Sequence, residues 1–328
     1  SFETLSNRFG ELLGIKEDLS KRSLSELNAL DLFKRIDFRI LESLMAGVID
    51  RSITEANCKE VVHQRSTTYW YEEHFKEMYQ AVLTATQIFA KLRELHLEIT
   101  TLADGIHKYA STWYQIDQLY REYIHYVRKS KQTTFFKTLN GMVEGHYSNN
   151  FLKTLNNNWQ LVVDGLDHWG DLHTNMQRHF YEDFVTPILS QGAKVAVVIS
   201  DAMRYEVGEA LRARILGEGR FTADIDAMLG MLPSYTQLGI AALLPNKALA
   251  IQADGTVAVD GLSASGTENR GKILGQVFPE DSRALLSADV EKMTTEERRE
   301  LFRGNQVVYI YHNQIDAVGD KLSEEERT

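Results

Sequence analysis

Proline and cysteine are scarce in this sequence and unevenly distributed. All four prolines lie at Pro187 or beyond, and Cys58 is the single cysteine among 328 residues. A lone cysteine excludes a disulfide within the chain and fits a reducing compartment, so we expect a cytoplasmic protein. No apolar run approaches the roughly 20 residues that a membrane span needs, so we expect no membrane association.

The chain also lacks an excess of positive charge. Its net charge of −10 argues against a surface that binds polyanions as a whole, although a local basic groove is compatible with it. A length of 328 residues with 43% hydrophobic content suffices for about two domains with sizeable cores. The chain begins at Ser1 and ends directly after a motif with functional residue types, so we expect a piece of a longer protein.

The first 186 residues contain no proline and are rich in Leu, Glu, Lys and Gln, which predicts a bundle of helices over residues 1–190. A capping box, Ser23 to Glu26, marks the start of one helix. We expect a break in the pattern around Asn156–Asn158 and Gly165. A last helix is predicted through Gln177–Val185.

One apolar stripe predicts a single long helix near residues 78–130, bent at Gly105. Such a stripe is typical of a coiled coil that binds a partner, but it also fits a helix packed inside its own bundle, and nearby helices favour packing. The stripe alternates steps of three and four through Leu92, Leu95, Ile99, Leu102, Ile106, Tyr109, Trp113, Ile116, Tyr120, Tyr123 and Val127.

Residues 191–328 have a different pattern, in which short Val- and Ile-rich runs alternate with helical segments. This alternation predicts an α/β domain with a largely parallel sheet. We expect the run Lys194–Ser200 to be a strand buried on both faces. The other predicted elements are strands at Phe221–Leu229 and Gln306–His312, helices at Ala202–Leu216, Tyr235–Leu244, Asn269–Val277 and Val290–Arg303, and a small hairpin around Asp254-Gly255.

Polar residues follow each of the three predicted strands. Asp201 follows the first, Pro233–Thr236 follows the second, and His312-Asn313 with Asp316 to Asp320 follows the last. Ligands of parallel α/β sheets bind at the carboxyl ends of the strands. The sequence therefore predicts one site at this edge, made of three separate clusters.

Each cluster also has a simpler interpretation. Asp201 suits a hard cation, but it is equally suited to capping the helix that follows. Thr236 lies near a predicted helix N-terminus, which favours binding of an anionic phosphate. Its hydroxyl would need a base or a metal to become a nucleophile. In isolation, a threonine at such a position is more often a helix cap. Asp316 and Asp320, four residues apart, would share a helix face and grip one cation, or form a solvated acidic turn.

Other patterns indicate different protein classes. Gly266, Gly271 and Lys272 have the spacing of a phosphate-binding P-loop, but Ile273 stands where Ser or Thr binds Mg²⁺. An aspartate after the first strand is also typical of phospho-acceptor receiver domains. That interpretation does not explain the cluster at Thr236. The basic stretch Arg121–Lys137 is either a nucleic-acid backbone contact or a solvated helix end.

Three segments carry a resemblance to a known family. VVISDAMRYEVGEAL, MLPSYTQLGIAALLP and VVYIYHNQIDAVGDK resemble the PglZ domain, a branch of the alkaline phosphatase superfamily found in type 1 BREX phage-defence systems. The resemblance implies that Asp201 and Asp316 bind a metal and that Thr236 is the nucleophile and a further metal contact. Asp320 stands where the family's D-x-x-x-H motif has His. The resemblance also implies Zn²⁺ or another divalent metal as cofactor, with the remaining metal ligands located after Thr328.

The resemblance also implies a function. We expect a metal-dependent phosphoester hydrolase, nuclease-like in a defence context, and we expect this chain alone to be inactive. Arg204, His312 and Asn313 are candidate phosphate contacts or supports of the metal ligands. Implied partners are other BREX proteins, BrxB among them, and nucleic acid. The alternative is a scaffold subunit of the defence complex without catalytic activity.

Overall fold

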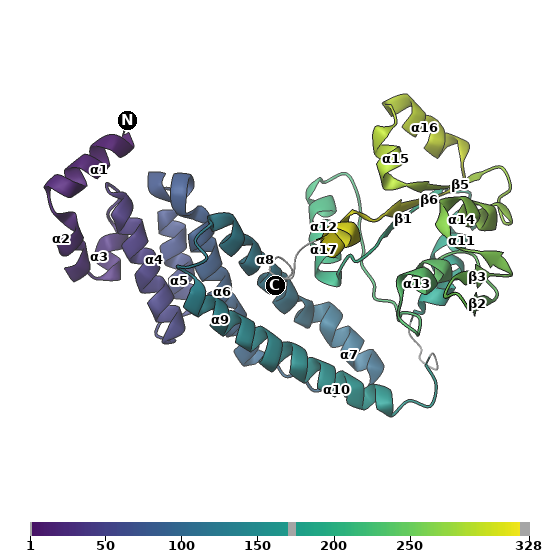
Figure 1. Ribbon diagram of the computed structural model, residues 1–328, viewed down its shortest axis with the longest axis horizontal. Helices are drawn as coiled ribbons and strands as arrows, with labels where there is room; N and C mark the ends of the chain where they lie inside the picture. The colour runs from purple at the N-terminus through teal and green to yellow at the C-terminus, as the bar shows by residue number, and fades with distance from the viewer. Residues whose placement is uncertain (1, 170–174, 322–328) are drawn as a thin grey trace. The chain divides into compact units, whose positions relative to one another are not determined.

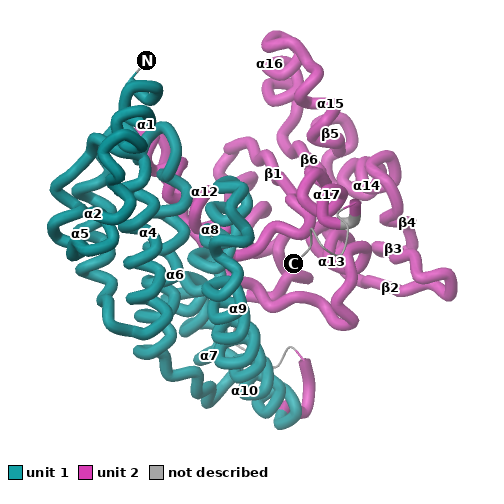
Figure 2. The backbone as a smooth tube through the Cα atoms, turned by 60° about the vertical axis from the view of Figure 1, so that its left-hand side comes forward, with its two compact units in different colours: residues 1–165 teal, residues 166–328 magenta. Residues whose placement is uncertain are grey.

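The computed structural model describes residues 2–169 and 175–321, which form two compact units, 1–165 and 166–328, coloured separately in Figure 2. The predicted fold class, a helical part followed by an α/β part, is confirmed. The expected boundary at 190/191 differs from this division. Residues 166–190 belong to the second unit because Tyr181 and Val185 are buried in its core.

The described residues of the first unit form helices and no strand, as the absence of proline predicts. Ser23 caps α3 through the predicted box, in which its Oγ accepts from the backbone N–H of Glu26. The predicted break at Asn156–Asn158 is wrong, because α10 continues to a cap at Gly165. The α-helices in Figure 1 are α1 (Phe2–Leu12), α2 (Ile15–Lys21), α3 (Leu24–Asn28), α4 (Lys34–Ile49), α5 (Glu55–Arg65), α6 (Lys76–Glu94), α7 (Leu102–Lys108), α8 (Tyr114–Ser130), α9 (Lys137–Gly145) and α10 (Lys153–Asp164).

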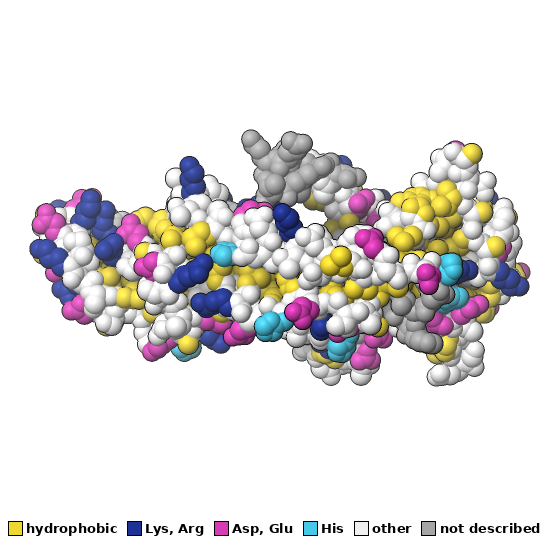
Figure 3. Space-filling model, turned by 90° about the horizontal axis from the view of Figure 1, so that it is seen from below, with side chains coloured by type: hydrophobic (Ala, Val, Ile, Leu, Met, Phe, Trp, Pro, Cys, Tyr) yellow, Lys and Arg dark blue, Asp and Glu magenta, His cyan; other side chains and the backbone are white. Residues whose placement is uncertain are grey.

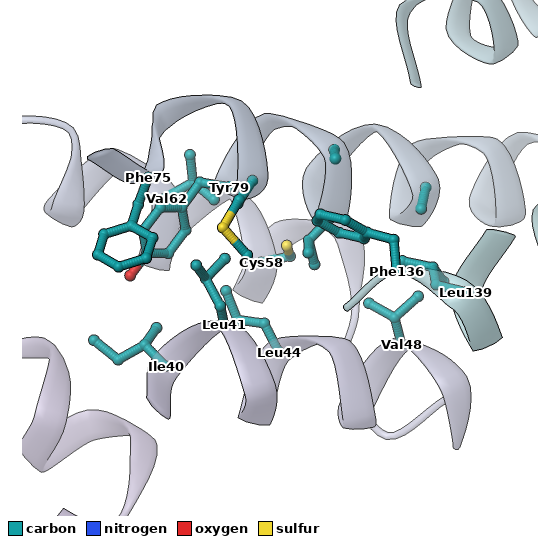
Figure 4. Close-up of a cluster of buried hydrophobic side chains, with 14 of the residues drawn as sticks. Ile40, Leu41, Leu44, Val48, Cys58, Val62, Phe75, Tyr79, Phe136 and Leu139 are labelled. Atoms are coloured by element: carbon teal, nitrogen blue, oxygen red, sulfur yellow. The ribbon is translucent and has the colours of Figure 1, made fainter. Parts of the chain in front are cut away.

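Most buried side chains of this unit form one hydrophobic cluster. Figure 4 shows Leu41 and Leu44 of α4 packed beneath Cys58 of α5 and Tyr79 of α6. Full burial of each such aliphatic side chain contributes about 1.5–3 kcal/mol. The helices therefore owe their stability to a shared core more than to their individual propensities.

A buried ion pair joins three helices inside this cluster. Arg65 donates from Nε and Nη2 to the two carboxylate oxygens of Asp37, at 2.9 and 2.7 Å. The hydroxyl of Tyr79 donates to the same carboxylate at 2.8 Å. Burial, and secondly the Asp37 charge, raises the pKa of Tyr79, so the phenol stays protonated and serves as a donor. The network fixes α4, α5 and α6 to one another.

The predicted single helix near 78–130 is wrong, because the chain leaves the helical conformation between Leu95 and Thr101. Thr101 caps α7, and its Oγ1 accepts from the N–H of Asp104 at 3.1 Å. The predicted bend at Gly105 is absent, because Gly105 lies within α7. The glycine instead permits close packing, since a Cβ there would lie 2.9 Å from Cγ2 of Ile99. The apolar stripe continues because α6 and α8 face shared cores, which confirms packing within the chain for this stripe.

The second unit is built on a parallel sheet of three strands in the order β1-β6-β5. These are β1 (Val195–Ser200), β5 (Ser282–Leu286) and β6 (Val307–His312). The parallel pairing and two of the strands match the prediction, whereas β5 is an additional strand. The expectation that β1 is buried on both faces is wrong, because Val198 is 62% exposed. The central β6 is the strand buried on both faces.

The predicted strand Phe221–Leu229 is also absent. Its only pairing among the described residues is a bridge between Leu229 and Met176, outside the sheet. The predicted helix Val290–Arg303 is two helices, because Thr294 and Glu297 form a capping box that starts a new one. The helices of this unit are α11 (Thr186–Ser190), α12 (Tyr205–Gly217), α13 (Thr236–Ala242), α14 (Gly266–Gly275), α15 (Ser287–Lys292), α16 (Thr295–Gly304) and α17 (Gln314–Lys321).

A second, antiparallel sheet contains the predicted hairpin. It consists of β2 (Leu249–Ile251), β3 (Val257–Val259) and β4 (Leu262–Ser263), with Gly255 at a φ of 81° in the turn between β2 and β3. Glycine adopts this left-handed conformation without strain. Across both units, none of the helices in the described residues has the length and apolar character needed to span a bilayer.

Candidate active site

The carboxyl ends of β1 and β6 lie side by side. Their parallel register pairs Ser200 with His312, so the residues that follow both strands leave the sheet at one edge. The backbone N–H of Asp201 donates to the carbonyl of His312 at 2.9 Å, which extends the pairing by one residue. This arrangement holds Asp201 against the last strand by main-chain contacts alone.

Asp201 sits in a tight turn before α12. The next residue, Ala202, has a φ of 59°, a left-handed conformation that costs an L-residue about 1–2 kcal/mol. Its N–H donates to Oδ1 of Asp201 at 3.0 Å. The helix begins only at Tyr205, with Arg204 at the N-cap, so Asp201 does not cap it. Of the two interpretations of Asp201, the helix cap is thereby excluded.

Thr236 is the first residue of α13, and Tyr235 occupies its N-cap position. Thr236 is therefore not a helix cap either. The far end of α13 is anchored to the sheet, because the hydroxyl of Tyr309 in β6 donates to the carbonyl of Leu243 at 2.8 Å. Burial raises the pKa of Tyr309, which keeps this donor protonated.

A hollow of about 400 Å³ is lined by Asp201 and Thr236, along with Ser200, Ser234 and Tyr235. Its volume lies in the range of small-ligand sites, about 300–1,000 Å³. The hollow thus contains one carboxylate and several hydroxyl groups at the carboxyl edge of the sheet.

Gln177 lines this hollow, although the sequence analysis did not select it. Its Oε1 accepts from the N–H of Met231 at 3.1 Å, and its Nε2 donates to the carbonyl of Gly239 at 3.2 Å. A Cβ at Gly239 would lie 3.2 Å from the same Nε2, so glycine there permits the close approach. Gln177 thereby links the segment before Thr236 to the helix that follows it.

His312 does not line the hollow, but it contacts a residue that does. Its Nδ1 lies 2.8 Å from Oγ of Ser200, which fixes the orientation of the imidazole. Arg204 forms an ion pair with the fully buried Glu206, 3.1 Å from Nε to Oε1. An incoming phosphate would have to compete with Glu206 for this guanidinium. Ser200 and Glu206 were missed because their partners are visible only after folding.

Asp316 and Asp320 both lie in α17, which starts after β6 at the same edge of the sheet. Asp316 does not line the hollow, and nor does Asn313, which lies between β6 and α17. The side chain of Asp320 lies outside the described residues, as do the positions after Lys321.

Within residues 2–169 and 175–321, no three His, Cys, Asp or Glu side chains are clustered so as to hold a metal ion. Asp201 and Thr236 provide a carboxylate and a hydroxyl oxygen, donors that fit a divalent cation as part of a ligand set. Four ligands are usual for zinc, so the residues in the hollow fit such an ion only as a partial site.

The basic stretch Arg121–Lys137 has the features of a helix end. Lys131 terminates α8, and Lys129 pairs with Glu77 at 2.9 Å. Figure 3 shows basic and acidic side chains interspersed over the helical unit on the face in view, without a broad basic tract. Cations in the last turn are favoured by the helix dipole, which accounts for their position without a nucleic acid.

Comparison with known proteins relates both units to one group. Residues 180–328 match the family model described as the BREX system PglZ alkaline phosphatase-like domain. The chain is 31% identical, over 99% of its length, to the alkaline phosphatase-like protein PglZ of Bacillus cereus (strain H3081.97). It is 34% identical, over 92% of its length, to the alkaline phosphatase-like protein BrxZ of Escherichia coli O9:H4 (strain HS). The chain spans 38% and 36% of these relatives. No solved structure matches it significantly.

Proposed function

We propose, from the match of residues 180–328 to the family model of the BREX system PglZ alkaline phosphatase-like domain, that the protein is a metal-dependent phosphoester hydrolase with Thr236 as nucleophile. The observation that carries the proposal is the hollow shared by Asp201 and Thr236 at the carboxyl edge of the parallel sheet. Asp201 is excluded as a helix cap, which leaves its carboxylate available for a ligand.

In the proposed mechanism, Oγ of Thr236 attacks phosphorus in line with the ester oxygen that leaves. The new P–O bond forms as the bond to the leaving ester oxygen breaks, and the departing alcohol takes up a proton in place of the one that the Thr236 hydroxyl loses. A diester substrate thus gives a threonyl phosphodiester and an alcohol, and water then releases a phosphomonoester and restores Thr236. A divalent metal held by Asp201, Thr236 and Asp316 would lower the pKa of the attacking hydroxyl and balance developing charge. Asp201 would orient such a cation, and the turn at Ala202 holds Asp201.

The substrate class we propose is a nucleic-acid phosphodiester. Support comes from the family model, whose description names the BREX system, and from the relatives, which are called alkaline phosphatase-like proteins. Other BREX proteins are proposed partners, with BrxB as one candidate. The hydrolysis of bis(p-nitrophenyl) phosphate and of p-nitrophenyl phosphate separates diesterase from monoesterase activity.

Removal of the Thr236 hydroxyl tests the mechanism. We expect Thr236→Val to lower kcat for phosphoester hydrolysis by about 10³-fold or more, because the nucleophile is lost. Thr236→Ser should retain measurable activity, and Ser234→Ala, which removes a neighbouring hydroxyl from the same hollow, should have a much smaller effect. The assay requires a polypeptide as long as the curated relatives, with added Zn²⁺. Equal rates for Thr236→Val and the unmodified enzyme would exclude Thr236 as nucleophile.

A non-catalytic assembly role is the second candidate. It is favoured by the lack of a three-residue metal cluster among the described side chains. Metal analysis of a polypeptide of the relatives' length separates the two functions. Stoichiometric zinc that is lost in Asp201→Ala and Asp316→Ala supports the hydrolase, whereas a purified protein that takes up no divalent metal supports the scaffold.

A further inference from the structure

The helical unit contains a cavity of about 440 Å³ that the proposed phosphoester site does not use. Its walls are largely apolar and include Phe89, Leu95 and Met142. All of its lining residues lie between Val48 and Thr154, within the first unit. A concave apolar site of this volume matches the pockets in which small molecules bind.

The polar part of this cavity is positively charged. Arg51 and Arg93 line it, and no Asp or Glu does, although the chain as a whole carries a net charge of −10. Neither guanidinium forms an ion pair with any described carboxylate. Two free guanidinium groups beside apolar walls complement an anionic head group on an apolar body.

Arg51 has a backbone conformation that is unusual for its type. Its φ is 63°, directly after Asp50, which ends α4. Glycine is the usual residue at such a position because it avoids the strain. Strain of this kind gathers at functional sites, where the surrounding structure maintains it for a purpose. Arg51 thus lies directly after the end of α4 and lines the cavity.

His146 also lines the cavity. Its Nδ1 lies 2.8 Å from Nδ2 of Asn150, which orients the imidazole. The ring packs edge-on against Phe89, with centroids 5.2 Å apart. The imidazole that lines the cavity is thus held by two contacts.

We propose that this cavity binds a small amphipathic anion, with a carboxylate or phosphate head at Arg51 and Arg93 and an apolar body against Phe89 and Leu95. The walls account for the apolar body, and the two guanidiniums account for the charge. This site is independent of the proposed hydrolase chemistry and needs no metal.

Isothermal titration of the 328-residue chain with decanoate, decyl phosphate and decanol tests the proposal. We expect both anions to bind with one site per chain and decanol to bind at least about tenfold more weakly, because it lacks the charge. The ratio of the two anion affinities identifies the preferred head group. Affinity for decanol equal to that for both anions, or no binding at millimolar concentrations, would overturn the proposal.

Variants of the two arginines provide the second test. Arg51→Gln and Arg93→Gln keep most of the side-chain stem, and each should weaken decanoate binding about tenfold. Arg8 is exposed and does not line the cavity, so Arg8→Gln should leave the affinity for decanoate unchanged. Circular dichroism melts establish that all three variants fold. Unchanged decanoate affinity in both cavity variants would also overturn the proposal.

Discussion

At the scale of single residues, Ala202 and Asp104 each have a local geometry with a measurable consequence. Ala202 turns the chain sharply after Asp201 in a conformation that strains an L-residue, at the entrance to the candidate site. Asp104 accepts hydrogen bonds from Thr100 and Lys108 at the start of α7. The geometry of Ala202 is strained and lies beside the candidate site, whereas that of Asp104 stabilises a helix terminus.

Replacing Ala202 with glycine should increase stability. Relief of the left-handed strain outweighs the greater flexibility of glycine in the unfolded chain, so we expect Ala202→Gly to raise the free energy of unfolding by about 0.5–1 kcal/mol. Urea unfolding measures the change. The control is Ala210→Gly, on the exposed face of α12, which should be destabilising. A loss of stability in Ala202→Gly would contradict the strained geometry.

Asp104 should make stability depend on pH in the acid range. Hydrogen bonds, first from Lys108 and then from Thr100, lower the pKa of Asp104 to about 2. Its stabilising contribution is therefore present above the unfolded-state pKa of about 4 and is lost as pH falls towards 2. The free energies of unfolding of Asp104→Asn and of the unmodified protein should differ at pH 6 and converge near pH 2. A difference that stays constant with pH would exclude this ionisation as its cause.

At the scale of elements, the three helices α4, α5 and α6 depend on one buried charge pair. Asp37 and Arg65 are 0% and 1% exposed on their side chains, and Tyr79 completes the network. A buried pair of this kind is weak evidence of net stabilisation, but removing one partner leaves an uncompensated charge. The pair therefore makes the mutual arrangement of the three helices sensitive to a single substitution.

Asp37→Asn should lower the free energy of unfolding by about 3–5 kcal/mol, because Arg65 loses its counter-ion in a buried site. Chemical denaturation followed by circular dichroism measures the loss. Glu72→Gln removes a carboxylate from the exposed pair with Lys76 and should have little effect. Similar effects of the two substitutions would show that the buried position of Asp37 has no special cost.

Elements with strong local signals could be predicted from sequence. The Val-rich run of β1, the capping box at Ser23 and the hairpin at Gly255 were all correctly placed. The interruption after α6 could not be seen, because Leu95 and Ile99 continue the apolar stripe while packing against other helices. Periodicity reports which residues are buried, and a break that keeps them buried leaves the pattern unchanged.

In the candidate site, too, some residues could be predicted from local sequence signals and others could not. Of the three clusters predicted to form one site, Asp201 and Thr236 line one hollow, whereas His312, Asn313 and Asp316 do not line it. Gln177 was invisible, since its partners Met231 and Gly239 lie more than 50 residues away in sequence. Contacts over such separations are set by the tertiary fold and leave no local periodicity.

At the scale of the whole molecule, each unit has its own core. The two clusters of the helical unit draw only on residues up to Leu155, and the α/β cluster draws only on residues from Phe180 onward. The buried network of Asp37 also lies entirely within the first unit. The helical unit therefore contains all the buried residues that its core requires.

Residues 1–165 should consequently fold when expressed alone. We expect a helical circular dichroism spectrum and a cooperative thermal transition, since a domain with its own core behaves as a folding unit. The Asp37→Asn form of the same fragment should melt at a lower temperature. A fragment with a broad, non-cooperative transition would show that its core is incomplete without residues 166–328.

The pairing of β1 with β6 has a consequence for biosynthesis. Ser200 and its register partner His312 are 112 residues apart in the chain. At about 5–20 residues per second, a ribosome needs roughly 5 to 20 seconds to produce β6 after β1. During that interval the helical unit has already emerged and can fold, whereas the Val-rich edge of β1 has no partner. A newly made chain is therefore most vulnerable to aggregation, and most in need of a chaperone, between the synthesis of these two strands.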